Sequence, residues 1–148
     1  MPTVAAIAFK AKKNAPMQLL NTSQVTCAKG IVGDVYGRPG KRQVTLLSKQ
    51  QWQTVCEQME LPLVWTVRRA NILIDDIIFS AEDVGKQVQI GQLILEITGE
   101  TDPCNKMELA YSGLRQALEP DWRGGVTCRV LQDGEIHIGD KLLFSNAS

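Results

Sequence analysis

Short apolar stretches separated by glycines constrain the fold of this chain more than any other feature. Residues 3–9 are apolar and rich in β-branched side chains, and shorter segments at 17–20, 24–28, 42–47 and 68–75 have the same character. Only two parts of the chain show the spacing of helices. Many short strands, glycine turns and few helices predict a mostly β fold, a barrel with two or three inserted α-helices.

The two expected helices have identifiable ends. Ser48, with Gln51 three residues later, is a capping box, and this predicts a helix that ends before Pro62. A second apolar set with helical spacing covers 107–118 and stops at Pro120. The apolar face of the first helix is formed by Trp52, Val55, Cys56 and Met59.

Glycine also marks the expected turns. Asp133-Gly134 lies between two apolar stretches and predicts a two-residue β-hairpin. The segments 88–95 and 136–143 resemble each other, and each turns at a glycine. The glycine-rich loop over 30–41 is long for a small domain, which favours a functional role for this loop.

Length and charge limit the function classes. A chain of 148 residues can bury about two-thirds of its unfolded surface, so we expect a single domain over 1–148. Sixteen Lys and Arg balance sixteen Asp and Glu, which gives no global field for binding nucleic acid or an anionic membrane. There is no apolar signal region and no long uncharged apolar run, so we expect a cytoplasmic protein that does not span a membrane.

The four cysteines differ in context. They are widely spaced without a C-x-x-C pair, which argues against a zinc knuckle or a redox dithiol. Cys27, Cys56 and Cys128 lie in apolar settings, and we expect them to pack as small hydrophobic residues. Cys104 instead follows a proline in a polar loop between an apolar strand and a helix. A thiol presented there can act as a ligand, a nucleophile or a sulfur carrier.

Several motifs occur in order along nearly the whole chain: Gly30-x-x-Gly-Asp34, Arg42-Gln-Val-Thr-Leu-Leu47, Arg68-Arg-Ala-Asn-Ile72, Pro103-Cys104, and Arg123-Gly-Gly-Val-x-x-Arg-Val130 with Ile138-Gly-Asp140. Together they resemble the MOSC domain family, named after the C-terminal domain of molybdenum cofactor sulfurases. The resemblance implies a MOSC-type β-barrel and a role in molybdenum–pterin or sulfur chemistry.

The resemblance assigns one functional cysteine, and only Cys104 stands at the matching position. In relatives that reduce N-hydroxylated compounds, the corresponding thiolate ligates molybdenum held by a pterin dithiolene. In relatives that transfer sulfur, the cysteine carries a persulfide. The chain is therefore expected to be a molybdenum-dependent oxidoreductase, or else a sulfurtransferase or non-catalytic carrier of sulfur or cofactor; an incidental thiol on a scaffold is the third reading.

The residues around Cys104 suggest how such a site would be built. The positive end of the following helix and Lys106 would stabilise a thiolate, and Asp102 is grouped with Cys104 as a catalytic candidate. A pterin cofactor carries phosphate and hydrogen-bonding ring edges, which need cations and exposed amides. The candidates for holding it are Arg42, Arg68, Arg69, Arg123, Lys106, Asn71, Gly33, Asp34 and Gly124.

Some of these candidates have simpler alternatives. Adjacent strand residues point to opposite faces, so only one of Arg68 and Arg69 should face the site. Asp34 and Asp102 can orient the arginines or bind substrate, and loop capping is the competing role for each. His137 is interpreted as structural. The lysines at positions 10, 12 and 13 are interpreted as a solvated charge run in preference to a rim for an anionic ligand or a docking partner.

The chain departs from the larger members of the family. It is too short to contain a pyridoxal-phosphate desulfurase domain, and it has neither a recognisable Schiff-base lysine motif nor an iron–sulfur cysteine pattern. We therefore expect that it does not bind pyridoxal phosphate. Its electrons or sulfur would come from an external donor protein and act on a small-molecule substrate.

Overall fold

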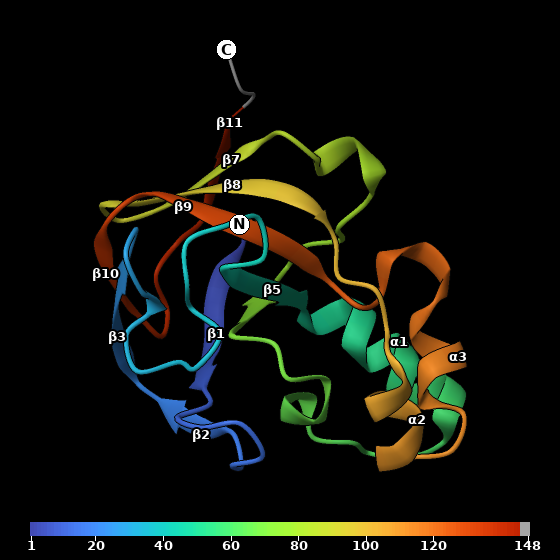
Figure 1. Ribbon diagram of the computed structural model, residues 1–148. Coiled ribbons are helices and arrows are strands. Elements are labelled where there is room, and N and C mark those ends of the chain that lie inside the picture. The colour runs from blue at the N-terminus through green and yellow to red at the C-terminus, as the bar shows by residue number, and fades with distance from the viewer. Residues whose placement is uncertain (146–148) are drawn as a thin grey trace.

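The computed structural model describes residues 1–145 and shows a strongly curled β-sheet with helices on one side (Figure 1). The main sheet has eight strands in the order β11-β7-β8-β9-β5-β6-β1-β2. Their bounds are β1 Thr3–Phe9, β2 Gln18–Leu20, β5 Val44–Ser48, β6 Ile72–Asp75, β7 Gln87–Ile90, β8 Leu93–Glu100, β9 Val126–Gln132 and β11 Leu143–Ser145. A smaller sheet contains β10 Gly134–His137, β3 Thr22–Thr26 and β4 Gly30–Ile31, in that order. The predicted mostly β fold is confirmed.

Backbone hydrogen bonds join the start of the chain to the segment that precedes β11. Val4 N–H donates to Asp140 O (2.8 Å), and Gly139 N–H donates to Val4 O (2.8 Å). Leu142 N–H donates to Pro2 O (3.0 Å). These bonds bring together regions from opposite ends of the strand order and roll the sheet into its barrel-like shape, which removes exposed edge groups.

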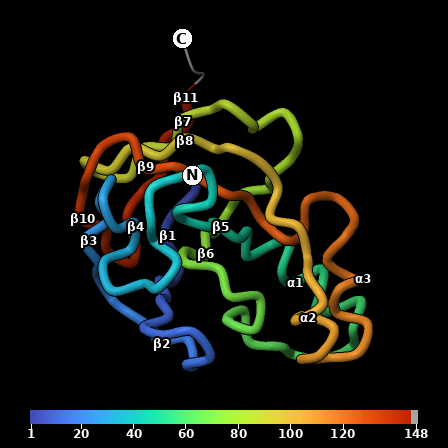
Figure 2. The backbone as a smooth tube through the Cα atoms, viewed as in Figure 1, coloured from blue at the N-terminus to red at the C-terminus, as the bar shows by residue number. Residues whose placement is uncertain are grey.

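Three short α-helices and three 3₁₀ turns complete the fold. The helices are α1 Lys49–Met59, α2 Asn105–Ala110 and α3 Leu114–Leu118, and the 3₁₀ turns are η1 Trp65–Arg68, η2 Ala81–Asp83 and η3 Pro120–Trp122. Figures 1 and 2 show the α-helices gathered on one side and β3, β4 and β10 on the other. None of the helices within residues 1–145 has the length and apolar character needed to span a bilayer.

Two apolar clusters lie on the two faces of the main sheet. Ile7, Leu46 and Ile72 belong to the cluster inside the curl, while Leu47 and Leu73 belong to the cluster under the helices. Neighbouring residues of β5 and of β6 thus alternate between the two clusters, as the two-residue period of a strand requires.

The first predicted helix is confirmed as α1, but its capping box is only half formed. Ser48 is the N-cap, and its hydroxyl accepts a hydrogen bond from Gln51 N–H (3.1 Å). The side chain of Gln51 does not return to Ser48. It is buried and bonds both backbone groups of Phe79 and the carbonyl of Asp121. This glutamine therefore ties two loops to α1.

The second predicted helix is interrupted. The chain forms α2 and α3 with a break between them, where Gly113 has a φ of +89°. That left-handed conformation favours glycine and ends the continuous helical path.

The predicted hairpin at Asp133-Gly134 is wrong. Strand β10 pairs with β3 and not with β9, so the chain crosses there from one sheet to the other. Asp133 Oδ1 accepts a hydrogen bond from Cys27 N–H (2.7 Å), which fixes the crossing against the β3–β4 turn. A side chain at position 134 would collide with the backbone of Leu93, so glycine is needed there for close packing rather than for a turn.

The strand predicted over 68–75 begins only at Ile72. Residues 65–68 form η1, and Arg69 has a φ of +65°. The side-chain Oδ1 of Asn71 accepts hydrogen bonds from Thr45 N–H (3.0 Å) and from the Thr45 hydroxyl (3.2 Å). Asn71 therefore pins the chain to β5 just before the parallel pairing of β5 and β6 begins.

Candidate functional site

The thiol of Cys104 is exposed, as predicted. The chain runs from the end of β8 to α2 on the side where the helices gather, and Cys104 is the N-cap residue of α2 (Figure 1). An N-cap side chain often accepts a hydrogen bond from the helix backbone, but this one makes none. The sulfur is therefore free to meet an external group.

Arg68 anchors the loop that carries Cys104. Its Nε donates to Gly124 O (2.9 Å) and its Nη2 donates to Thr101 O (3.4 Å), so it links the end of β8 to the start of β9. The side chain is only 7% exposed. Burial lowers the pKa of Arg68 to about 10, and the neighbouring Cys104 and Asp102 oppose that shift. The guanidinium remains charged at neutral pH and acts on the loop backbone.

Gly124 and Thr101 complete this anchor. A Cβ at position 124 would lie 2.5 Å from Thr101 O, so only glycine allows the approach. The hydroxyl of Thr101 is buried without a hydrogen-bond partner among the described residues. Such orphaned groups are rare in folded proteins and mark places where a ligand or water is needed. Nothing in the sequence pattern singled out Thr101.

Two adjoining hollows are lined by the 10–17 loop and the region before β6; residues 34–45 complete the inner one, and α2 completes the outer one. The inner pocket, of about 100 Å³, is lined by Lys10, Met17, Asp34, Tyr36, Arg42, Gln43, Thr45, Arg69 and Asn71. The outer pocket, of about 220 Å³, is lined by Lys10, Ala15, Pro16, Met17, Thr66, Val67, Arg69, Lys106, Met107, Ala110 and Tyr111. Lys10, Met17 and Arg69 belong to both, so we treat the two pockets as one cationic cleft.

Lys10 differs from the other two lysines of its cluster, and sequence reasoning left it out of the candidate site. Lys12 and Lys13 are exposed as predicted, but Lys10 is only 3% exposed, so the solvated charge run is wrong for that residue. Burial lowers the pKa of Lys10, and the positive charges of Arg69 and Lys106 lower it further, while Asp34 acts in the opposite direction. Within residues 1–145 its ammonium forms no ion pair.

Two of the predicted cofactor contacts, Asp34 and Asn71, already use polar atoms of their side chains in hydrogen bonds within the protein. Asp34 caps its loop by accepting hydrogen bonds from Lys10 N–H (2.8 Å) and Tyr36 N–H (3.3 Å), and burial raises the pKa of its carboxyl group. Asn71 uses its oxygen on Thr45 and its amide nitrogen on Ala8 O (3.3 Å). Both residues line the inner pocket, but they do so as supports of its walls.

The exposed cations of the cleft are Arg42, Arg69 and Lys106. No ion pair is formed by any of them in the part of the chain that the structure describes. Arg69 holds its left-handed backbone directly after η1, a strained conformation of the kind that clusters at functional sites. The two adjacent arginines thus differ: Arg68 is buried in the anchor and Arg69 faces the cleft.

Arg123 and Gly33 are predicted cofactor contacts that belong neither to the cleft lining nor to the Arg68 anchor. Arg123 donates to Gln58 Oε1 (2.6 Å) and Ala117 O (3.1 Å), so it ties the helices together. Gly33 lines another hollow, which adjoins the inner pocket at Asp34, and a side chain there would contact the ring of Phe9.

The other cysteines are placed differently from one another. Cys128 is buried, as predicted, and Cys56 is half-buried with its sulfur 3.6 Å from Leu63 O. Cys27 is exposed, so the expectation that it packs in the core is wrong. It lies in the turn after β3, where a hydrogen bond to the side chain of Asp133 raises the pKa of its thiol.

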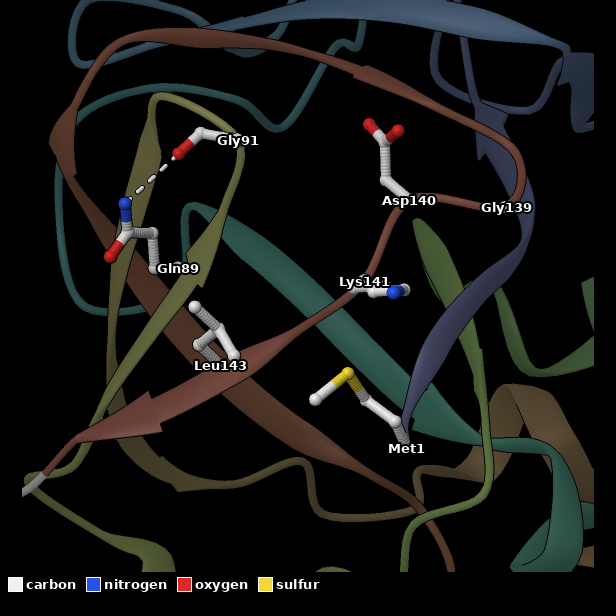
Figure 3. Close-up of a pocket in the computed structure, with 7 residues that line it drawn as sticks. All are labelled: Met1, Gln89, Gly91, Gly139, Asp140, Lys141 and Leu143. Carbon is white, nitrogen blue, oxygen red and sulfur yellow. Dashed lines mark hydrogen bonds between the residues drawn. The ribbon is translucent and has the colours of Figure 1, made fainter.

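A larger hollow of about 510 Å³ lies elsewhere on the barrel (Figure 3). Met1, Gln89, Gly91, Gly139, Asp140, Lys141 and Leu143 line it, and Figure 3 shows the Gln89 side chain turned to Gly91, with which it makes a hydrogen bond of 3.1 Å. This hollow shares no lining residue with the cationic cleft, and Arg42, Arg69 and Lys106 are all absent from its lining. Size alone therefore does not identify the chemical site.

A family model for the MOSC domain matches residues 22–143. The chain belongs to the MOSC domain family. The matched range includes all the motifs from Gly30 to Asp140 on which the predicted resemblance rests. No curated protein sequence is significantly similar to this MOSC chain.

Solved structures share the fold of this MOSC domain. The YuaD protein from Bacillus subtilis superposes with a TM-score of 0.81 at 16% identity, over 96% of this chain and 94% of that chain. YiiM from Geobacillus stearothermophilus gives a TM-score of 0.78 at 16% identity, over 99% of this chain and 76% of that one. YiiM from Escherichia coli gives 0.73 at 15% identity, over 99% and 71%. The predicted MOSC-type barrel is confirmed.

The donor set limits how a metal could be held. Within residues 1–145, no three His, Cys, Asp or Glu side chains converge into a metal site. A metal at Cys104 would therefore take a single thiolate from the protein and its remaining ligands from a bound organic group. A soft thiolate beside unpaired cations fits an anionic, sulfur-ligated molybdenum cofactor.

Proposed function

We propose that this MOSC domain binds a molybdenum–pterin cofactor at the cationic cleft, with Cys104 as the protein ligand of the metal, and reduces N-hydroxylated or similarly oxidised small molecules. One observation carries the proposal. The thiol of Cys104 is exposed, makes no cap hydrogen bond and lies on a loop that Arg68 anchors. The next residue, Arg69, lines a cleft whose cations have no ion-pair partner within residues 1–145. The bound cofactor would supply the two-electron chemistry of the metal.

The residues of the chain divide the remaining work. Arg42 and Arg69 would hold the anionic groups of the cofactor, because they line the inner pocket and no carboxylate within residues 1–145 lies at ion-pair distance from them. Arg68 would fix the position of the Cys104 loop. Asp102 is exposed beside this guanidinium and would hydrogen-bond a substrate that approaches the thiol.

An external protein would supply the electrons. The chain contains no cysteine pattern for an iron–sulfur cluster and no motif for pyridoxal phosphate, so we expect neither group to be bound. The cytoplasm, where free thiols stay reduced, suits a protein that depends on an unpaired cysteine.

Metal analysis tests the ligand role. The protein is purified from a host that makes the cofactor, together with Cys104→Ala and, as a matched control for another exposed thiol, Cys27→Ala. We expect near-stoichiometric molybdenum in the wild type and in Cys27→Ala, and loss of most of it in Cys104→Ala. Equal metal content in all three proteins, or none in any of them, would overturn the assignment.

A carrier of sulfur or of cofactor is the alternative, and one observation favours it. Cys104 is exposed and is not among the residues that line either pocket, so another protein could reach its sulfur. A persulfide carrier would gain one sulfur atom on Cys104, and not on Cys27, after incubation with a cysteine desulfurase and cysteine. Mass spectrometry of the alkylated peptides distinguishes the two thiols, and an unmodified Cys104 would reject the sulfur-carrier reading.

A further inference from the structure

The outer pocket of the cleft combines apolar and cationic lining residues. Its apolar lining is Ala15, Pro16, Met17, Val67, Met107, Ala110 and Tyr111, and its charged lining is Lys10, Arg69 and Lys106. No carboxylate lines it. A ligand that satisfies this surface carries an apolar body and a negative charge at one end.

The buried lysine makes the need for a negative charge specific. Lys10 is almost completely buried, lies under the repulsion of Arg69 and Lys106, and pairs with no carboxylate among residues 1–145. Burying an ammonium group is costly unless it is paired or hydrogen-bonded. An anionic ligand that reaches Lys10 supplies the missing partner.

The volume of the pocket limits the apolar body. At about 220 Å³ the outer pocket is smaller than the range of roughly 300–1,000 Å³ that accommodates drug-sized ligands. A single aromatic ring is of a size for this volume, and Tyr111 with Met107 and Ala110 of α2 supplies apolar lining against which it would pack. Aromatic rings gain additional stabilisation from such contacts beyond the area that they bury.

We propose that the outer pocket is a binding subsite for a single-ring aromatic carboxylate, with the carboxylate at Lys10 and Lys106 and the ring against Tyr111. The binding of this ligand does not depend on the function proposed above. The further statement that the ligand resembles the substrate does rest on that function. The inner pocket, of about 100 Å³, then remains for an anionic end group of the cofactor and not for the whole cofactor, and Arg69, which lines both pockets, lies between the two ligands.

Benzoate is the probe for this subsite. Binding is measured by calorimetry and by ligand-observed NMR on the full chain purified without cofactor, with benzyl alcohol and acetate as partial ligands. Lys106→Met should weaken benzoate binding about threefold, as expected for an exposed charge pair. Tyr111→Ala should weaken it about fivefold through lost ring packing, and Lys10→Met should weaken it about tenfold or more because a buried charge pair is lost.

Lys141→Met is the matched control, since Lys141 is an exposed lysine that lines the separate hollow in Figure 3. It should leave benzoate affinity unchanged. Circular dichroism identifies any variant that fails to fold, and Lys106→Met and Tyr111→Ala, which change exposed residues, keep the test independent of Lys10→Met.

The outcomes separate the two proposals. Saturable benzoate binding that weakens in the three cleft variants, and that benzyl alcohol and acetate do not reproduce, supports the subsite whether or not molybdenum is found. No benzoate binding, or equal binding by Lys106→Met, Tyr111→Ala and the wild type, overturns the subsite and leaves the cofactor proposal standing. Binding of acetate as tight as that of benzoate also overturns it, because the cations would then serve an oxyanion that has no ring.

Discussion

Exchange of the two adjacent arginines for methionine separates a structural cation from a ligand-binding one. Arg68 is 7% exposed and donates two hydrogen bonds to backbone carbonyls, whereas Arg69 is exposed and makes no side-chain bond with the described residues. Methionine preserves much of the length of arginine and removes its charge and its donors. We therefore expect Arg68→Met to unfold far more easily than Arg69→Met.

The magnitude follows from the contacts. Each hydrogen bond from a charged group contributes about 1.5–3 kcal/mol. Removing the buried charge also removes its desolvation cost, which offsets part of that loss. The two bonds of Arg68 therefore lead us to expect a net loss of about 2–4 kcal/mol in the free energy of unfolding for Arg68→Met. An exposed residue such as Arg69 should change it by no more than about 0.5 kcal/mol.

Urea denaturation followed by tryptophan fluorescence measures both values, provided that the dependence on urea keeps the same slope. Arg68→Lys is a further control, because lysine retains the charge but not the planar fork that reaches two carbonyls; it should recover less than half of the loss. Equal destabilisation by Arg68→Met and Arg69→Met, or a neutral Arg68→Met, would refute the assignment of Arg68 as the anchor of the Cys104 loop.

Three further predictions concern single groups. Asp34→Asn should gain stability relative to the wild type as pH rises from about 3 to about 7. Burial raises the folded-state pKa of Asp34, so the protonated carboxyl contributes stability to the folded wild type and that contribution is lost as the carboxyl ionises. Urea titrations at several pH values measure the difference in the free energy of unfolding, and a constant difference would contradict the prediction. Asp133→Asn should speed alkylation of Cys27, since the side chain of Asp133 raises the pKa of that thiol, while buried Cys128 should react only on unfolding. Peptide mass spectrometry follows both thiols, and an unchanged alkylation rate of Cys27 would count against its contact with Asp133. Gly124→Ala should lower the free energy of unfolding by about 2 kcal/mol or more, because the new methyl group would lie 2.5 Å from the carbonyl oxygen of Thr101. An unchanged melting temperature would show that the backbone moves to make room for the methyl group at little cost.

Local patterns predicted the elements whose signals are contained within a few residues. The strand over Thr3–Phe9 has the predicted bounds, and α1 begins after Ser48 and ends before Pro62. The proline, the polar loop and the following helix placed Cys104 in solvent. In each case the deciding interactions lie within one or two turns of the chain.

Features set by distant partners were not predictable in this way. Asp133-Gly134 has the composition of a hairpin turn, but β10 pairs with β3 because Asp133 binds the turn after that strand. The strand that was expected to start at Arg68 is delayed because Asn71 bonds to Thr45 on β5. Lys10 is buried because the region before β6 and α2 pack beside it, and no local pattern encodes that neighbourhood.

The family model begins at residue 22, yet Lys10 and the apolar wall at Ala15–Met17 come from the loop that precedes it. The ends of that loop are held by the Phe9–Gln18 pair of the β1–β2 ladder and by hydrogen bonds of Lys10 with Asp34 and Val35. Its length and composition can therefore change without shifting the register of the barrel. Ligand preference among proteins with this fold can diverge through one short, independently variable segment, and transplanting residues 10–17 between them would be the most economical way to exchange it.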